Sequence, residues 1–105
     1  MTANRELLEL AAKAAGMELD REGTAEADGK FAVLPDYRLW NPLTDDGDAL
    51  RLAVKLRMDI ASFSRGVRAD APNGDDCYED YNSDPYAATR RAIVRAAAEI
   101  GKAMP

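Results

Sequence analysis

The sequence predicts an α+β domain in which three helices alternate with two antiparallel hairpins. Two observations predict this class: apolar residues recur at helical spacing in three segments, and they alternate with polar residues in the stretches between. The 105 residues suffice for one domain with its own core and leave no room for two. We therefore expect a single domain over residues 1–105, in the order α-ββ-α-ββ-α, with an antiparallel sheet of about four strands.

The first third of the chain is predicted to form a helix followed by a hairpin. Asn4 is a suitable N-cap and Gly16 a suitable terminator for a helix that ends near Ala15. Alternating apolar and polar residues then indicate a half-buried strand over 17–22 and a second strand over 30–34. The polar, glycine-containing stretch between these strands is predicted to be the loop of the hairpin.

The middle of the chain is predicted to contain a connection and the second helix. The connection runs from Pro35 to Pro42 and includes the only tryptophan, Trp40. The helix is expected to begin at Thr44 or Asp45, because the aspartates that follow are stabilised at the positive, N-terminal end of the helix dipole. It is expected to continue to about Arg57.

The second hairpin is predicted from the strongest turn signal in the chain. One strand is expected over 58–72, with a bulge or bend where the alternation slips before Gly66. Asn73-Gly74 then predicts a type I′ turn, which requires positive φ at both residues. The returning strand is expected over 77–81, paired antiparallel with the first.

A third helix is predicted to follow this hairpin. Ser83 or Asp84 is its expected cap, and Pro85 suits its first turn. One face of the helix is predicted to be buried, and it consists of Tyr86, Ile93, Ala97, Ile100 and Met104.

Three further expectations concern individual side chains on the helices. Leu50 and Val54 widen the apolar stripe of the second helix and predict that it is covered on more than one side. Arg90 lies close to the buried face of the third helix and is expected to pair with Asp80 or another acid of the preceding segment. Arg95 points away from that face and is expected to be solvated.

Two segments of the chain resemble each other. LELAAKAAGMEL (8–19) and LRLAVKLRMDI (50–60) match at Leu, Leu, Ala, Lys and Met when one residue is dropped at Gly16. Either the similarity is a chance likeness of two alanine- and leucine-rich helices, or it marks an internal repeat.

The composition argues against several kinds of chemistry. The chain has no histidine, which removes the commonest general base and metal ligand. The single cysteine, Cys77, allows neither an internal disulfide nor a thiolate cluster. Asp80, Asn82 and Asp84 have the spacing that opens a calcium loop, but Pro85 stands where that loop needs glycine. We therefore expect a protein that is not an enzyme and has no cofactor and no metal.

Three segments of the chain resemble a known family. WNPLTDDGDALRLAVKL (40–56) and DPYAATRRAIVRAAAEIGK (84–102) are similar to the signature blocks of a family of small uncharacterised bacteriophage and prophage proteins, the phage ABA sandwich family. RELLELAAKAAG (5–16) is similar as well. The resemblance implies an alpha-beta-alpha sandwich and a phage origin in a bacterial host. It implies no activity and no catalytic residue.

The charge pattern bears on partners and location. The net charge of −5 argues against nucleic acid as a partner, because phosphate contacts need a basic surface. The charged N-terminal segment has neither a signal-peptide pattern nor a membrane span, so we expect a soluble protein of the host cytoplasm without a membrane partner. Because sheet edges leave backbone groups unpaired and the core is small, we also expect a homodimer.

The candidate interaction residues are aromatic and acidic. Tyr and Trp are favoured at protein interfaces because they bury large areas and keep a polar group. The residues that we single out are Trp40, Asp75, Asp76, Tyr78 and Tyr81. Packing inside the fold is the alternative for each aromatic residue.

Two functions stay open at this point. The first is a non-enzymatic interaction module that binds a host or phage protein. The alternative is a small-molecule or nucleotide-binding protein, with a pocket between sheet and helices in which Arg90 or Arg91 meets a phosphate.

Overall fold

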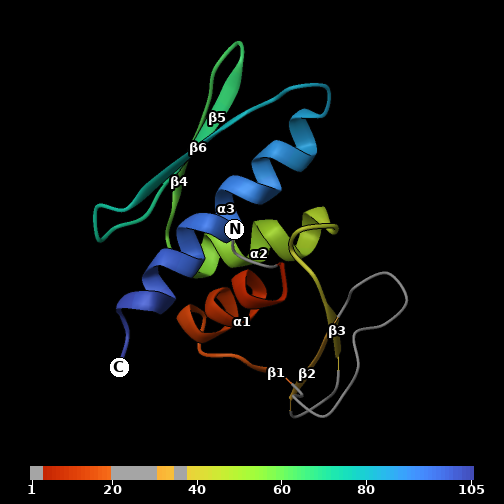
Figure 1. Ribbon diagram of the computed structural model, residues 1–105, viewed down its shortest axis with the longest axis vertical. Coiled ribbons are helices and arrows are strands. Elements are labelled where there is room, and N and C mark those ends of the chain that lie inside the picture. Colours follow the sequence, from red (N-terminus) through yellow and green to blue (C-terminus); the bar gives the residue numbers. More distant parts are fainter. Residues whose placement is uncertain (1–3, 20–30, 35–37) are drawn as a thin grey trace.

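The computed structural model describes residues 4–19, 31–34 and 38–105, and in these residues it contains three helices and six strands (Figure 1). The α+β class that the sequence predicts is confirmed. The elements are α1 (Asn4–Ala14), β1 (Glu18–Leu19), β2 (Phe31–Leu34), β3 (Arg38–Trp40), α2 (Asp46–Lys55), β4 (Asp59–Ser62), β5 (Gly66–Asp70), β6 (Asp76–Asp80) and α3 (Pro85–Ala103). The predicted loop between β1 and β2 lies outside the described residues.

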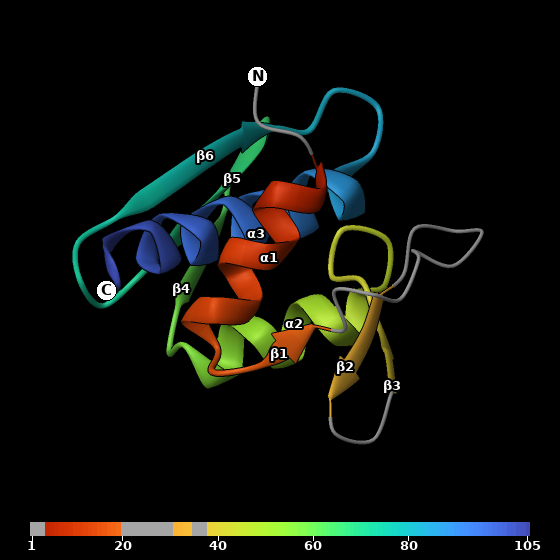
Figure 2. The same cartoon turned by 60° about the horizontal axis from the view of Figure 1, so that its bottom comes forward.

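The described strands form two antiparallel sheets, β1-β2-β3 and β4-β5-β6, in place of the single sheet of about four strands that the sequence predicted. Figures 1 and 2 show the helices between the two sheets, whereas the family resemblance implied a sheet layered between helices. The chain order becomes α-βββ-α-βββ-α because each predicted hairpin has one more strand than expected.

The added strand of the first sheet is β3, so the prediction that Pro35 to Pro42 form a connection is wrong for residues 38–40. Phe31 pairs with Trp40 and Val33 pairs with Arg38. The physical reason is visible in the burial of β3: Leu39 is exposed, whereas Trp40 is turned inward and only 3% exposed. Pro42 stands outside the strand, where it removes no ladder hydrogen bond, and Pro35 lies outside the described residues.

The added strand of the second sheet arises because the predicted strand over 58–72 folds back on itself. Phe63 N–H donates to Gly66 O at 2.8 Å, so Ser64 and Arg65 form a tight turn and not a bulge. Asp59 then pairs with Asp70, and Ser62 with Val67.

The turn between β5 and β6 differs from the expected type I′. Only Gly74 has positive φ, at 96°, and Asn73 does not. Gly74 N–H donates to Ala71 O, and Ala71 N–H donates to Asp75 O, so the loop has three residues. Pro72 explains the difference, because its fixed φ suits the first central position of a type I turn, which a left-handed glycine then closes. The predicted antiparallel pairing is confirmed, with Gly66 opposite Asp80 and Asp70 opposite Asp76.

The helix ends follow the local signals of the sequence. Asp45 caps α2 by accepting from the Asp48 N–H, and Asp84 caps α3 by accepting from the N–H groups of Tyr86 and Ala87. These caps confirm the predicted starts of both helices. Each cap satisfies N–H groups that have no partner within the helix.

Helices α1 and α2 end in the same way. Gly16 and Arg57 follow the last turns in the left-handed conformation, with φ of 72° and 57°. The closing N–H···O bonds run from Met17 to Ala12 and from Met58 to Ala53, at 2.8 and 3.0 Å. This arrangement is the Schellman motif. The shared motif places Gly16 opposite Arg57 and Met17 opposite Met58, so the two helix ends align without a gap. This supports an internal structural repeat and replaces the sequence alignment in which Gly16 was dropped.

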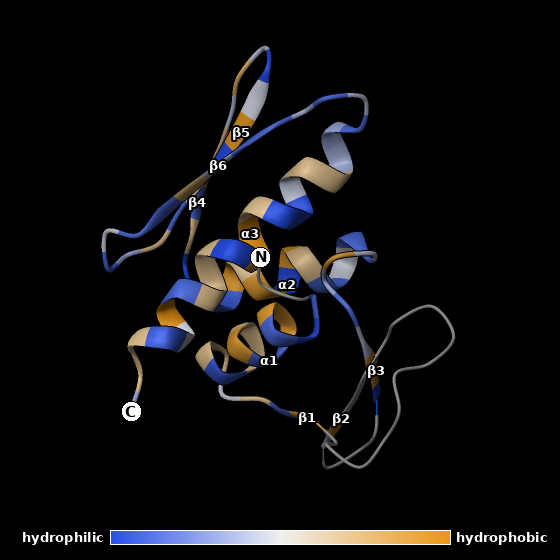
Figure 3. Cartoon of the chain, viewed as in Figure 1, coloured by the Kyte–Doolittle hydropathy of each residue, from blue (hydrophilic) through white to orange (hydrophobic). Residues whose placement is uncertain are grey.

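Helix α3 packs against α1, α2, β5 and β6 and forms the centre of the core. Figure 3 shows apolar residues on all three helices and on β5. Helix α3 crosses α1 very closely at Gly101, where an added Cβ would lie 2.1 Å from Leu10 O. The buried residues of α3 are mostly small, and they are Ala88, Ala92, Ile93, Val94, Ala96, Ala97, Ala98 and Gly101.

Four residues that were predicted to be covered are exposed. Tyr86 is 71% exposed in the first turn of α3, and Met104 lies beyond the last turn of the helix. Leu50 and Val54 are also exposed, so α2 is covered on one side only. The side of α2 that is covered includes Leu52 and Ala53, which are buried.

Candidate functional site

The five predicted interaction residues do not form one site. Trp40 is buried in the core near α2, so it is no interface residue. Tyr81 is half-buried and packs against the same core. Asp76 and Tyr78 are exposed on β6, and Asp75 lies in the preceding turn, bound to Asn73. Figure 1 shows β3 and β6 on opposite sides of the helices.

The structure instead brings together residues from all three strands of the second sheet. Val67, Ala69 and Cys77 are buried on the side of the sheet that packs against α3. Because side chains alternate along a strand, the residues between them project from the opposite side. We call this opposite side the outer face. From the strand register and the Phe63–Gly66 bond, it consists of Asp59, Ala61, Phe63, Gly66, Arg68, Asp70, Asp76, Tyr78 and Asp80.

One end of the outer face is a row of three aspartates. Asp59 pairs with Asp70, and Asp70 pairs with Asp76, so their carboxylates lie on three adjacent strands. Like charges placed opposite each other in a sheet repel. Arg68 donates from Nε to both carboxylate oxygens of Asp70, at 2.9 and 3.1 Å. Asp59 and Asp76 have no ion-pair partner among the described residues, so the row keeps a negative charge.

The centre of the outer face is aromatic. Phe63 and Tyr78 are 46% and 47% exposed, and the Arg68 guanidinium lies 5.6 Å from the centroid of the Phe63 ring. Tyr78 lies over Gly66, where a Cβ would come within 2.1 Å of the phenol oxygen. Desolvation and the Asp80 carboxylate raise the pKa of Tyr78 above its ordinary value. Gly66 is therefore the residue that leaves room for the phenol end of Tyr78 on the outer face.

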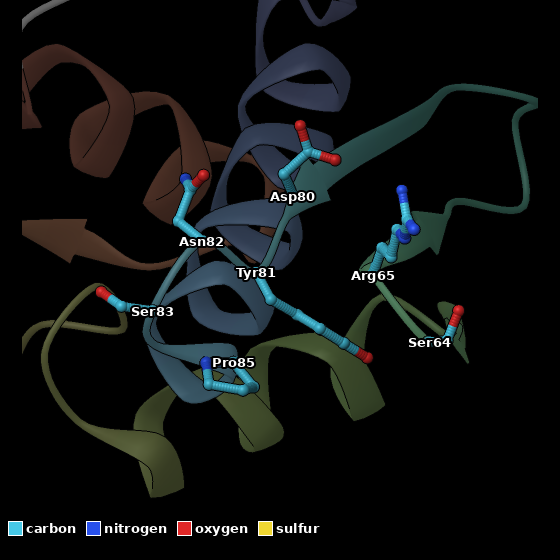
Figure 4. A pocket seen from close by; sticks show the side chains of 7 residues that line it. All are labelled: Ser64, Arg65, Asp80, Tyr81, Asn82, Ser83 and Pro85. Atoms are coloured by element: carbon cyan, nitrogen blue, oxygen red, sulfur yellow. The ribbon is translucent and has the colours of Figure 1, made fainter.

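A hollow of about 570 Å³ opens at one end of the same sheet. Figure 4 shows its lining, which comes from the β4–β5 turn and from the connection between β6 and α3. The lining residues are Ser64, Arg65, Asp80, Tyr81, Asn82, Ser83 and Pro85.

The arginines of α3 are bound within the protein. Arg90 donates from Nε to Leu43 O at 2.8 Å and from Nη1 to Asp46 at 2.6 Å, so the predicted pairing with Asp80 is wrong. Arg95, expected to be solvated, pairs with Glu79.

Arg91 also lies near a carboxylate, with its Nε 3.9 Å from Glu79. Neither Arg90 nor Arg91 lines the hollow. The phosphate site expected around them stays a prediction.

Cys77 is buried beneath the sheet, and burial raises the pKa of its thiol, against a smaller opposing effect of the Arg95 charge. A protonated thiol is a poor nucleophile. The described residues contain no group of three or more His, Cys, Asp or Glu that could hold a metal ion. In the same residues, no helix combines the length and the hydropathy that a bilayer span requires.

Comparisons of the chain with protein-family models, curated proteins and solved structures found no match. The resemblance to the phage family therefore stays a prediction.

Sequence reasoning identified Tyr78 and Asp76 but missed the strand partners of these residues. Asp59 and Asp70 lie in segments that the sequence assigned to one continuous strand, in which they could not have faced each other. The sequence signal for the turn between β4 and β5 was Gly66, which directly follows the Ser64–Arg65 turn.

Proposed function

We propose that the chain is a small accessory protein of phage origin that works in the host cytoplasm as a non-enzymatic protein-interaction module. Its partner is a host or phage protein, and the contact is made by the outer face. The observation that carries this proposal is the combination of exposed aromatic rings with a row of aspartates, of which only Asp70 has an ion-pair partner, on a sheet surface that none of the described helices covers.

The charges of the outer face specify the class of partner. The face carries four aspartates and one arginine, and the arginine is already bound to Asp70. A basic segment would relieve the repulsion within the row by approaching Asp59 and Asp76. Complementary charge also speeds encounter and suppresses wrong partners.

The aromatic centre adds a second requirement. Phe63 and Tyr78 offer ring faces that can cover an apolar side chain or the stem of an arginine. We therefore propose a partner segment that is rich in arginine or lysine and carries at least one apolar side chain. Such a contact weakens with salt, because exposed charges are screened.

A peptide titration followed by amide NMR tests the proposal. The probe is a short arginine-rich peptide with one central leucine, and the comparison peptide has glutamate in place of each arginine. We expect the basic peptide to shift the amides of β4, β5 and β6, and the acidic peptide to shift none. The double variant Asp59→Asn with Asp76→Asn should bind the basic peptide about tenfold more weakly.

The matched control is Glu6→Gln with Glu18→Gln, which removes the same charge from exposed positions on α1 and β1. If this control weakens binding as much as the aspartate variant, the attraction is a property of the net charge and the proposed surface is wrong. Shifts spread over α1 and α2 would lead to the same conclusion.

We further propose that the protein forms a homodimer. Strands β4 and β6 each pair on one side only in the described structure, so each offers unpaired backbone groups to a second copy. Sedimentation at micromolar concentration should show a dimer. A single species of 11.4 kDa at high concentration would contradict this expectation.

A further inference from the structure

The turn between β5 and β6 places an asparagine directly before a glycine. Asn73 and Gly74 are both exposed, and Figure 1 shows their turn projecting beyond the helices at the left. Outside the two chain neighbours, no atom lies within 4 Å of the place that a Cβ on Gly74 would take. Because glycine also has no side chain of its own to shield its nitrogen, the Gly74 nitrogen is accessible to the side chain of Asn73.

Two hydrogen bonds hold the Asn73 side chain against the backbone that follows it. Its Oδ1 accepts from the Asp75 N–H at 3.1 Å, and its Nδ2 donates to Asp75 Oδ2 at 2.9 Å. The first bond is an Asx turn, which closes a ring through the Asn73 side chain and the Gly74 backbone. The Asn73 Cγ and the Gly74 nitrogen belong to this ring and are held close together. Such an arrangement lowers the barrier to a reaction between two groups.

The Asp75 N–H also activates the Asn73 amide. When a nucleophile attacks Cγ, negative charge develops on Oδ1, which already accepts this hydrogen bond. A backbone N–H directed at a developing oxyanion stabilises the transition state. The opposing contact is the bond from Gly74 N–H to Ala71 O at 3.0 Å, which must open before the nitrogen can react. Hydrogen bonds at an exposed turn open at little cost in free energy.

The other asparagines of the chain lack this combination. Asn41 is buried and precedes a proline, which has no N–H and cannot act as the nucleophile. Asn4 and Asn82 precede an arginine and a serine, whose side chains shield the backbone nitrogen. A reaction between an asparagine side chain and the next backbone nitrogen should therefore be selective for Asn73.

We propose that Asn73 is a modification site at which the chain deamidates itself. The Gly74 nitrogen forms a bond to Cγ, the bond from Cγ to Nδ2 breaks, and Nδ2 leaves as ammonia with the proton of the Gly74 N–H. Water then opens the resulting cyclic succinimide at one of its two carbonyls and leaves aspartate or isoaspartate. Overall, a water molecule is consumed, an ammonia molecule is released, and nothing is oxidised or reduced.

The modification changes the end of the outer face that carries the aspartate row. A further carboxylate appears close to Asp75 and Asp76, and the hydrogen bond from Nδ2 to Asp75 is lost. Isoaspartate also adds a methylene group to the backbone of a turn that has only three residues. The added negative charge lies where a basic segment would approach in the proposed protein contact. The modification itself does not depend on that contact.

Mass spectrometry of the full chain tests the proposal. The folded protein is kept in warm, mildly alkaline buffer, sampled over time and digested with trypsin, and the first sample controls for change during digestion. Asn73 and Asn82 lie in the same tryptic peptide, 69–90, in which fragment ions locate each exchange of amide NH2 for OH. We expect Asn73 to react at least about tenfold faster than Asn82. The rate should rise with pH, because attack requires loss of the Gly74 N–H proton.

Two variants control for the chemistry. Asn73→Gln keeps the amide but requires a larger ring for the attack, so it should lose no ammonia at this residue. Gly74→Ala shields the nitrogen and should slow the reaction by about tenfold. Because alanine is strained at the positive φ of Gly74, the comparison of Asn73 with Asn82 in the unchanged protein is decisive. The proposal is overturned if Asn73 keeps its amide, if Asn82 reacts as fast, or if Gly74→Ala reacts as fast as the unchanged protein.

Discussion

Arg95 on α3 donates a hydrogen bond from Nη1 to the Glu79 carboxylate on β6, and it also donates to Tyr78 O at 3.2 Å. Glu79 is half-buried at the edge of the core, so this pair joins the last strand to the central helix in a partly desolvated setting. Hydrogen bonds to charged groups in such settings are stronger than exposed ion pairs.

Replacing Arg95 by alanine should lower the free energy of unfolding by about 1–2 kcal/mol, because Glu79 would lose its main partner. Arg91→Ala is the control, since its Nε lies 3.9 Å from the same carboxylate and its side chain is exposed. That control should cost less than about 0.5 kcal/mol. Urea denaturation of both variants measures the difference, and equal losses would contradict the assigned role of Arg95.

Replacing Arg90 by alanine should lower the free energy of unfolding by roughly 1–3 kcal/mol. The Arg90 side chain is only 17% exposed and ties α3 to the start of α2 through Leu43 O and Asp46. Asp46→Ala should cost less, because this carboxylate is exposed and the bond to Leu43 O survives. The comparison is again by urea denaturation. An Arg90 variant as stable as the unchanged protein would show that the α2–α3 contact does not depend on this side chain.

Gly101→Ala should be among the most damaging small substitutions. The added methyl would lie 2.1 Å from Leu10 O, so α1 and α3 would have to move apart, at a cost of about 3 kcal/mol. Gly47→Ala is the matched control in α2, where the nearest atoms are the side-chain ends of Arg51 at 3.2 Å and of Asp45 at 3.3 Å. Because these side-chain ends can shift by a few tenths of an ångström and alanine has the higher helix propensity, the free energy of unfolding should change there by less than about 1 kcal/mol. Thermal unfolding of both variants gives the test.

Stability should decline in alkaline solution. Burial raises the pKa of the Cys77 thiol in the folded state, and the pKa of Tyr78 is raised as well. The folded protein therefore binds these protons more tightly than the unfolded chain does. The free energy of unfolding falls as pH rises above the unfolded thiol value of about 8.5. Below that pH both states hold the proton and the contribution is constant.

The Cys77→Ala variant checks the origin of this effect. Its free energy of unfolding should fall less steeply between neutral pH and about pH 10 than that of the unchanged protein. Identical slopes would mean that the thiol does not contribute. The measurement is a set of urea denaturation curves across this range.

Local signals predicted the helices well, because each cap depends on only a few neighbouring residues. Asp45, Asp84 and Gly16 stand at the helix ends where their chemistry placed them. The prediction of one continuous strand over 58–72 was wrong, because the alternation of apolar and polar residues does not reveal where the chain reverses. Without this reversal, the row of Asp59, Asp70 and Asp76 on adjacent strands could not be predicted.

The partners of the arginines could not be derived from periodicity. A helical wheel placed Arg90 near the buried face correctly, but Asp46 comes from a different helix and a distant part of the chain. Which acid reaches which arginine depends on how α2 and α3 cross. The hollow between the Ser64–Arg65 and Asn82–Ser83 turns was missed for the same reason, since its walls meet only after the sheet has formed.

Helix α3 follows all the other described elements in the chain, yet α1, α2, β5 and β6 all pack against it. During synthesis the apolar face of α1 and the inner side of the second sheet therefore lack their covering surface until α3 has emerged. Contacts between such distant segments make folding slower than local pairing would. Helix α1 is made first and gains its main neighbour, α3, only when the last helix has been completed, so the nascent chain acquires its native core late.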